Sequence, residues 1–157
     1  FLKPYLKFLG LGIPSNLDAW DGYPSERNRL YNLMKQANKK FISLAGDTHN
    51  SWVSELEDST GKKIGIELGA PSVTSPGITD ALKLNEKEFT DRIIELNSEL
   101  KWMDPSHRGF LKLDCNQDSI LATFHYIKEL EKIDPEIKSY KSFKIQRKEY
   151  DLAQIES

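Results

Sequence analysis

The chain has 157 residues, of which 38% are hydrophobic and 29% are charged, and its formal net charge is -2. That length suits a single domain or a part of a larger one, and it allows a sizeable core without disulfides. Because acidic and basic residues nearly balance, we expect no nucleic-acid partner. No apolar run reaches the roughly 18 residues of a membrane helix, so we expect no membrane span. The single cysteine, Cys115, cannot form an internal disulfide.

The apolar N-terminal segment does not have the pattern of a signal peptide. Lys3, Pro4 and Lys7 interrupt its apolar residues, and no small-residue cleavage site follows them. We therefore expect residues 1–15 to be a linker that packs on a preceding part of the protein. Residues 1–157 are then a single partial domain.

The pattern of residues 24–45 predicts a helix followed directly by a strand. Pro24 suits the first position of a helix over residues 24–40. One face of that helix is apolar, with Leu30, Leu33, Met34 and Ala37 at helical spacing. Residues 41–45 are a short apolar run, as in a buried strand. A helix followed by a buried strand is typical of an α/β sheet covered on both faces.

The middle of the chain predicts a β-hairpin and then a loop. Apolar residues alternate with glycine or glutamate over residues 64–68. Residues 52–56 are the expected partner strand, with residues 58–62 as the connection. Residues 69–77 are rich in Gly, Pro, Ser and Thr, which predicts a loop. Two interpretations stay open: its hydroxyls face a ligand, or its small residues keep it close to the strand ends.

The second half of the chain is expected to change from helix to strands. Asn85 is suited to cap a helix over residues 86–100. Beyond it, residues 111–115, 119–127 and 142–150 have the composition of strands. The expected fold class is therefore α/β with a mixed sheet and with antiparallel strands toward the C-terminus.

The segment after residues 41–45 carries the residue types best suited to chemistry. Asp47 and His49 follow an apolar strand, and ligands of open α/β sheets bind at that end of the strands. A carboxylate beside a neutral imidazole suits a divalent or trivalent metal. Gly46 would let the backbone turn sharply before them. The alternative from the residues alone is that Asp47 caps the turn and His49 is exposed.

Four segments, in this order, are NLDAWDGYPSERNRL, FISLAGDTHNSW, ELGAPSVTSPG and LKWMDPSHRGFLKLD. Together they resemble the C-terminal half of PhoD-type alkaline phosphatases. The resemblance implies the calcineurin-like metallophosphatase fold, an αββα sandwich with metals at the strand ends, of which this chain forms half. Residues 46–49 match the G-D-x-H element of the family. By this resemblance, Asp47 and His49 are metal ligands.

The resemblance also implies an activity and a location. These enzymes hydrolyse phosphate monoesters or diesters with bound metals, here expected to be iron and calcium, in the periplasm or outside the cell. The remaining family ligands come from segments upstream, and nothing in these 157 residues matches them. We therefore expect activity in the full-length parent and none in the isolated chain. Two alternatives remain: a non-catalytic binding or assembly module, and a degenerate homologue that has lost its ligands.

Half of such a sheet would expose an unpaired edge strand and an apolar face. We therefore expect the isolated chain to dimerise through that edge.

Three further residues are candidates for binding substrate. Asp21 lies in a W-D-G-Y run that resembles a pocket rim of the family, although it also suits a helix cap. Asn50 is suited to donate to phosphate or, equally, to form the turn. Arg108, beside an exposed His107, is placed to face a phosphate. Trp52 is expected to be a packed anchor for the loop that carries Asp47 and His49.

Overall fold

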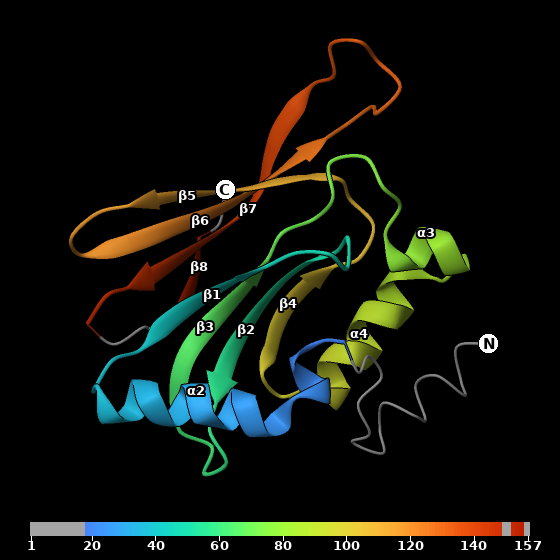
Figure 1. Ribbon diagram of the computed structural model, residues 1–157. Coiled ribbons are helices and arrows are strands. Elements are labelled where there is room, and N and C mark those ends of the chain that lie inside the picture. Colours follow the sequence, from blue (N-terminus) through green and yellow to red (C-terminus); the bar gives the residue numbers. More distant parts are fainter. Residues whose placement is uncertain (1–17, 149–151, 156–157) are drawn as a thin grey trace.

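The computed structural model describes residues 18–148 and 152–155, so the predicted linker at residues 1–15 lies outside the described residues. Two four-stranded sheets pack face to face, and helices lie beside one of them (Figure 1). This mixed α/β arrangement confirms the expected fold class.

The first sheet, sheet A, is mixed and has the strand order β1-β3-β2-β4. Its strands are β1 (Phe41–Ala45), β2 (Ser51–Glu57), β3 (Lys63–Gly69) and β4 (Leu100–Asp104). β1 and β3 are parallel, with Ile42 opposite Ile66 and Leu44 opposite Leu68. β2 runs antiparallel to both of its neighbours, β3 and β4. The predicted hairpin of β2 and β3 is therefore confirmed, with residues 58–62 as its connection.

The second sheet, sheet B, is antiparallel throughout and has the order β5-β6-β7-β8. Its strands are β5 (Gly109–Cys115), β6 (Ser119–Ile127), β7 (Ile137–Gln146) and β8 (Leu152–Ile155). The β6–β7 hairpin projects beyond the body of the molecule (Figure 1). The strand predicted over residues 142–150 is wrong in its bounds: β7 begins earlier and ends at Gln146, because its register follows β6.

The core lies between the inner faces of the two sheets. Its buried members are Val53, Ile66, Leu68, Ala122, Phe124, Tyr126, Phe143 and Ile145. Trp102 joins the two sheets, since its ring lies 4.8 Å from that of Phe124 and 5.4 Å from that of Phe143, centroid to centroid. Alternation along each strand places these side chains on the face of each sheet that meets the other sheet.

The helices lie around sheet A. The 3-10 helix η1 (Trp20–Gly22) leads into α2 (Pro24–Gln36). α3 (Ile78–Leu82) follows the loop after β3, and α4 (Glu86–Leu96) precedes β4. The Asn85 side chain caps α4 by accepting from the Glu88 backbone N–H at 2.9 Å, as predicted. Among the described residues, no helix has the length and apolar character needed to cross a bilayer.

Both long helices end earlier than the sequence suggests. α2 stops at Gln36 rather than at residue 40. Two residues after its end, Asn38 adopts a left-handed conformation with φ of 50°. α4 stops at Leu96 rather than residue 100, because residues 100–104 pair with β2 as strand β4. Pairing with a strand far away in sequence therefore overrides the helical spacing of the leucines at 96 and 100.

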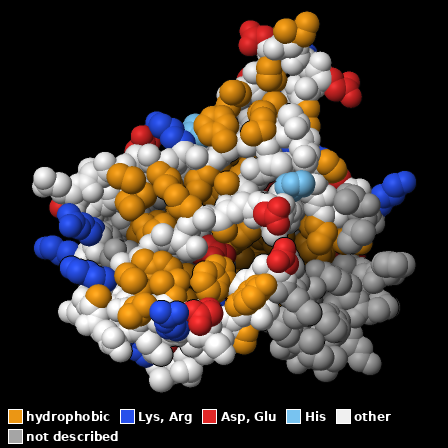
Figure 2. All heavy atoms as spheres, in the orientation of Figure 1, with side chains coloured by type: hydrophobic (Ala, Val, Ile, Leu, Met, Phe, Trp, Pro, Cys, Tyr) orange, Lys and Arg blue, Asp and Glu red, His pale blue; other side chains and the backbone are white. Residues whose placement is uncertain are grey.

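Strand β1 is more exposed than its apolar sequence predicts. It pairs only with β3 among the described strands, and Leu44 is 62% exposed. Figure 2 shows hydrophobic side chains gathered on this face of the molecule and along the projecting hairpin. Sheet A is covered by sheet B on one face and by α2 on the other, as expected, but β1 lies at its edge and Leu44 stays exposed.

Candidate metal centre

Three loops meet at one end of the strands of sheet A. The pairings of Ala45 with Gly69, Trp52 with Gly69, and Ser51 with Asp104 bring the ends of β1, β3 and β4 together with the start of β2. The loops at this end of the strands are residues 46–50, 70–77 and 105–108. The sheet thus gathers the predicted Asp47 and His49 with side chains that lie far away in the sequence.

The turn that carries Asp47 and His49 has an unusual backbone. Asp47 has φ of 69° and His49 has φ of 61°, and the Thr48 N–H donates to the Gly46 carbonyl at 2.8 Å. Residues with a Cβ pay roughly 1–3 kcal/mol each for such conformations, which persist where the surroundings impose them. The expectation that Gly46 makes the turn is wrong. Its φ is not positive and a Cβ there would meet nothing within 4 Å, so the two candidate ligands carry the strain themselves.

The ring of His49 is oriented by a backbone carbonyl. His49 Nδ1 lies 3.2 Å from the Pro76 carbonyl oxygen in the loop after β3. A proton on Nδ1 donates to that oxygen and leaves the lone pair of Nε2 available to a metal. Asp47, on the same turn, is exposed. The pair therefore has the donor types of a metal site, with one ring nitrogen of His49 left for a ligand, and the two residues fit the metals that the resemblance implies.

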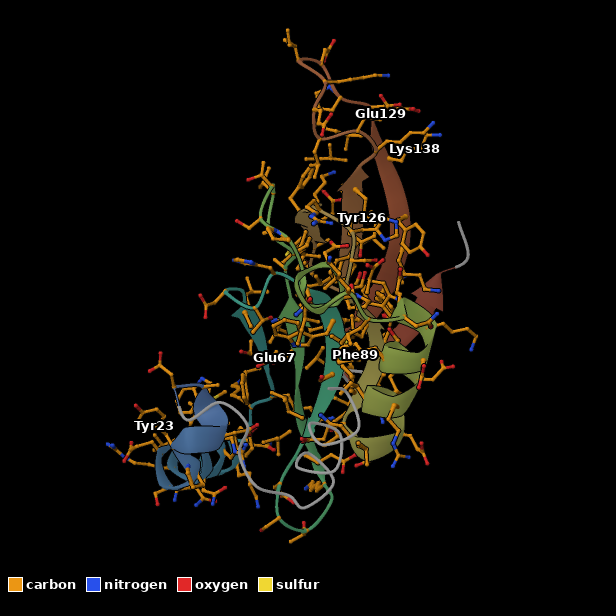
Figure 3. All side chains as sticks on the ribbon, turned by 90° about the vertical axis from the view of Figure 1, so that its right-hand side faces the viewer. Tyr23, Glu67, Phe89, Tyr126, Glu129 and Lys138 are labelled. Carbon is orange, nitrogen blue, oxygen red and sulfur yellow. The ribbon has the colours of Figure 1, made fainter. Side chains whose placement is uncertain are left out.

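Asp47 lines a cleft of about 410 Å³ between α2 and the outer face of sheet A. Trp52 lies flat on Gly69, where a Cβ would come within 2.1 Å of its ring, and its Nε1 donates to Glu67 Oε1 at 2.9 Å. Glu67 lies on the side of the sheet that faces α2 (Figure 3). This packing agrees with the expectation that Trp52 is an anchor beside the loop.

The pKa values of two further groups in the cleft, Glu99 and Tyr31, are raised. Burial raises the pKa of Glu99, although the hydrogen bond from the Glu57 backbone N–H opposes the shift. Burial also raises the pKa of Tyr31, and the negative charge of Glu99 adds to this effect. Acidic side chains, namely Asp18, Asp21, Asp47, Glu67 and Glu99, outnumber the single basic one, Arg27, among the described residues that line the cleft.

The three predicted substrate-binding residues lie in different surroundings. Asp21 lines the same cleft as Asp47 and forms an ion pair with Arg27 at 2.6 Å. Asn50 is buried, and its amide bonds to the backbone of the surrounding loops. Arg108 pairs with Asp80 at 2.6 Å and donates to the Ser106 carbonyl. Their roles toward a substrate stay predictions.

A cluster that sequence reasoning missed lies where β4 ends. Glu86, Asp104 and His107 have ligand atoms within 4.8 Å of one another, the only such group of three found among the described residues. Asp104 is buried and accepts from the backbone N–H groups of Ser106 and His107 and from His107 Nδ1. The Asp-Pro-Ser-His spacing was the available signal, because a carboxylate three residues before a histidine suits such a turn.

Tyr126 connects this cluster to the start of β2. Its hydroxyl donates to Ser51 Oγ at 2.9 Å, and its ring stacks on that of His107 with 4.9 Å between the ring centroids. Burial raises the pKa of Tyr126, and the charge of Asp104 adds to the shift. Because Ser51 directly follows the Asp47–Asn50 loop, sheet B fixes the position where that loop joins β2.

Ionisation of the Asp104–His107 pair makes stability depend on pH. The hydrogen bond to Asp104 raises the pKa of His107 above its ordinary 6.5, although burial opposes this. Burial raises the pKa of Asp104, but the hydrogen bonds from His107 outweigh it and hold the pKa below its ordinary 3.8. Glu86 favours the charged imidazole and Arg108 disfavours it. The aromatic rings of Tyr126 and Tyr140 lie against it.

We expect the pair to stabilise the fold most between about pH 4 and 6.5. The contribution of His107 is complete below its unfolded pKa and is lost as the pH rises through the raised folded pKa. The contribution of Asp104 is lost as the pH falls through its lowered folded pKa. Urea unfolding between pH 6 and 8.5 should show a decline in stability that His107→Gln flattens. An unchanged slope in that variant would contradict the assignment.

An α/β sandwich with carboxylate and imidazole groups at one end of its strands has the layout of an enzyme that binds its ligand at those strand ends. The sequence model of the PhoD-like phosphatases matches residues 5–124, and the chain belongs to this family. The chain is 27% identical over 147 residues to alkaline phosphatase D of Bacillus subtilis (strain 168), covering 90% of this chain and 24% of that protein. A solved structure of PhoD superposes with a TM-score of 0.73 at 26% identity, over 89% of this chain and 27% of the solved one. The chain thus spans about a quarter of the length of these relatives.

Proposed function

We propose that the protein to which this chain contributes hydrolyses phosphate esters with bound metals, and that Asp47 and His49 are two of the metal ligands. The observation that supports this most is the bond between His49 Nδ1 and the Pro76 carbonyl, on a turn where both candidate ligands have positive φ. Membership of the PhoD-like phosphatase family supports the type of reaction.

The chemistry of the two side chains fits a hard or borderline cation. A carboxylate oxygen and an imidazole nitrogen suit iron, and the carboxylate also suits calcium. We propose iron with calcium, as the sequence resemblance implies. A bound metal would activate a water as hydroxide and polarise the phosphoryl oxygens. Within this chain, Asp47 supplies negative charge and His49 supplies a neutral nitrogen whose orientation Pro76 maintains.

This chain holds only a part of the proposed site. Asp47 and His49 belong to no group of three possible ligands among the described residues. Two donors leave most of the coordination positions of a metal open, so affinity for the isolated chain should be weak. We propose that the remaining ligands come from other parts of the protein and that the isolated chain is inactive.

Of the three residues predicted to bind substrate, the proposal keeps Asp21 and Arg108. Asp21 lines the cleft that Asp47 also lines. Arg108 would bind a phosphate only after leaving Asp80, and Asn50 only after giving up its bonds to the loops. Asp21 and Arg108 are therefore the candidates that a small rearrangement of side chains makes accessible.

The test is a paired assay of the isolated chain and the full-length parent. Each is analysed for bound metal and for hydrolysis of p-nitrophenyl phosphate and its bis-ester. We expect a metal-loaded, active parent beside a metal-free, inert chain, and the ratio of the two substrates would report monoester or diester preference. An inert, metal-free parent would favour a binding module or a degenerate homologue. Activity in the isolated chain would mean that the site lies elsewhere.

The same preparations test two further parts of the proposal. The exposed Leu44 and the edge position of β1 support self-association of the isolated chain, which sedimentation would detect. A monomer at high concentration would contradict it. We also propose a periplasmic or extracellular location, as the resemblance implies, which fractionation of cells that express the parent would test.

A further inference from the structure

The Asn50 side chain bridges the two loops that form the candidate centre. Its Nδ2 donates to the Thr48 carbonyl at 2.7 Å, and its Oδ1 accepts from the Ile78 N–H at 3.2 Å. Asn50 is 6% exposed. At this depth the second N–H of its Nδ2 and the second lone pair of its Oδ1 are poorly accessible to a ligand in solution.

The first bond, from Asn50 Nδ2 to the Thr48 carbonyl, holds the turn that carries Asp47 and His49. Thr48 lies between Asp47 and His49, which both have positive φ. A bond to the Thr48 carbonyl fixes the peptide plane between Thr48 and His49. Because residues with a Cβ leave this conformation readily when unsupported, that bond opposes relaxation of the turn.

The second bond, from the Ile78 N–H to Asn50 Oδ1, holds the segment that contains Pro76, the partner of His49. Ile78 lies two residues after Pro76, whose carbonyl faces His49 Nδ1 at 3.2 Å. Between them, Gly77 packs so closely that a Cβ would lie 2.2 Å from the Pro105 carbonyl oxygen. The Thr79 hydroxyl donates to that same oxygen at 3.1 Å. Residues 76–79 therefore form a strap, held by Asn50 on one side and by the loop after β4 on the other.

We infer that Asn50 is a positioning residue of the metal centre and does not bind substrate. Through its two bonds it keeps Asp47 and His49 in their left-handed conformations and keeps the Pro76 carbonyl against the His49 ring. Loss of the amide frees the turn and the strap together, so the two candidate ligands lose their fixed orientation. This inference rests on the proposed function, in which Asp47 and His49 bind metal.

The experiment uses the full-length parent, depleted of metal and titrated with Co²⁺ while visible absorption is recorded. We expect Asn50→Ala to weaken Co²⁺ binding about 10–100-fold, the size of effect typical of residues that orient metal ligands. The absorption spectrum of the Co²⁺ complex should also change, because the geometry of the ligands changes. At saturating metal, the KM for p-nitrophenyl phosphate should stay at the wild-type value.

Matched variants separate the possible outcomes. Asn32→Ala makes the same substitution at an exposed position of α2 and should leave Co²⁺ binding unchanged. Asn50→Ser keeps a small polar side chain but lacks the amide that bonds Ile78; if the alanine variant does not fold, it replaces that variant and should bind Co²⁺ more weakly than wild type. Unchanged Co²⁺ affinity with a raised KM would assign Asn50 to the substrate and overturn the inference. A lowered melting temperature alone, with Co²⁺ affinity and spectrum unchanged, would also overturn it.

Two more variants distinguish this inference from the proposed function. Asp47→Asn and His49→Gln should each weaken Co²⁺ binding more than Asn50→Ala does. If both bind Co²⁺ as the wild type does, the proposed function fails. If both lose Co²⁺ while Asn50→Ala does not, the proposed function stands and only the role of Asn50 is wrong.

Discussion

Replacing Asp47 by Asn or His49 by Gln in the full-length parent should remove nearly all phosphatase activity. Asp47→Asn removes the negative charge and one carboxylate oxygen, His49→Gln removes the imidazole, and each nearly preserves the size of the side chain. A metal supplies several kcal/mol of transition-state stabilisation, so losing it should lower kcat/KM by on the order of 10³-fold or more. Hydrolysis of p-nitrophenyl phosphate and metal content, measured on the same sample, should fall together.

The control for these substitutions removes a carboxylate from another surface. Asp114 on β5 pairs with Lys112 at 3.0 Å and is exposed. Asp114→Asn should therefore leave metal content and activity at the wild-type level. Full metal content and full activity in both Asp47→Asn and His49→Gln would refute their assignment as ligands. Full metal content with lost activity would place them in contact with substrate or water instead.

Truncation of Phe124 should cause the largest loss of stability in the chain. Phe124 is fully buried between the sheets and contacts Trp102 and Phe143. Removing a buried phenyl ring forfeits its transfer free energy and leaves a cavity, at a cost of about 3–5 kcal/mol. Because a domain of this kind has only about 5–15 kcal/mol of total stability, Phe124→Ala should leave it close to unfolding.

Urea unfolding of the purified chain, followed by tryptophan fluorescence, measures this loss. Trp102 packs directly on Phe124 and should report the change. Leu130→Ala is the control, since Leu130 is 41% exposed on the projecting hairpin and should change stability by less than about 0.5 kcal/mol. Equal unfolding midpoints for the two variants would show that the sheets do not form a common core.

Local pattern predicted the β2–β3 hairpin well. Period-two alternation over residues 64–68 and the turn residues between the strands are read from neighbouring positions, and Asp58 closes the connection by accepting from the Thr60 and Lys62 N–H groups. The N-cap at Asn85 was predictable for the same reason. In each case the stabilising contacts join residues that are close in sequence.

Strand β4 and the exposure of β1 were not predictable in this way. Leu100, the first residue of β4, continues the helical spacing of α4, and only pairing with β2 places it in a strand. β1 is apolar enough for the centre of a sheet, but its position at the edge follows from the order of the strands. Strand order depends on how the whole chain packs, which no window of sequence contains.

The candidate site also has a part that local sequence determines and a part that only the tertiary structure determines. The sequence alone determined that Asp47 and His49 share one turn, because two residues that follow the same strand stay together wherever the strand lies. Only the tertiary structure decided which groups surround them. Pro76 reaches His49 across 27 residues, and Tyr126 reaches Ser51 across 75. Such contacts arise when strands distant in sequence become neighbours in a sheet or face each other across the core. The residue types of the candidate ligands are therefore a local property, whereas their orientation depends on the whole fold.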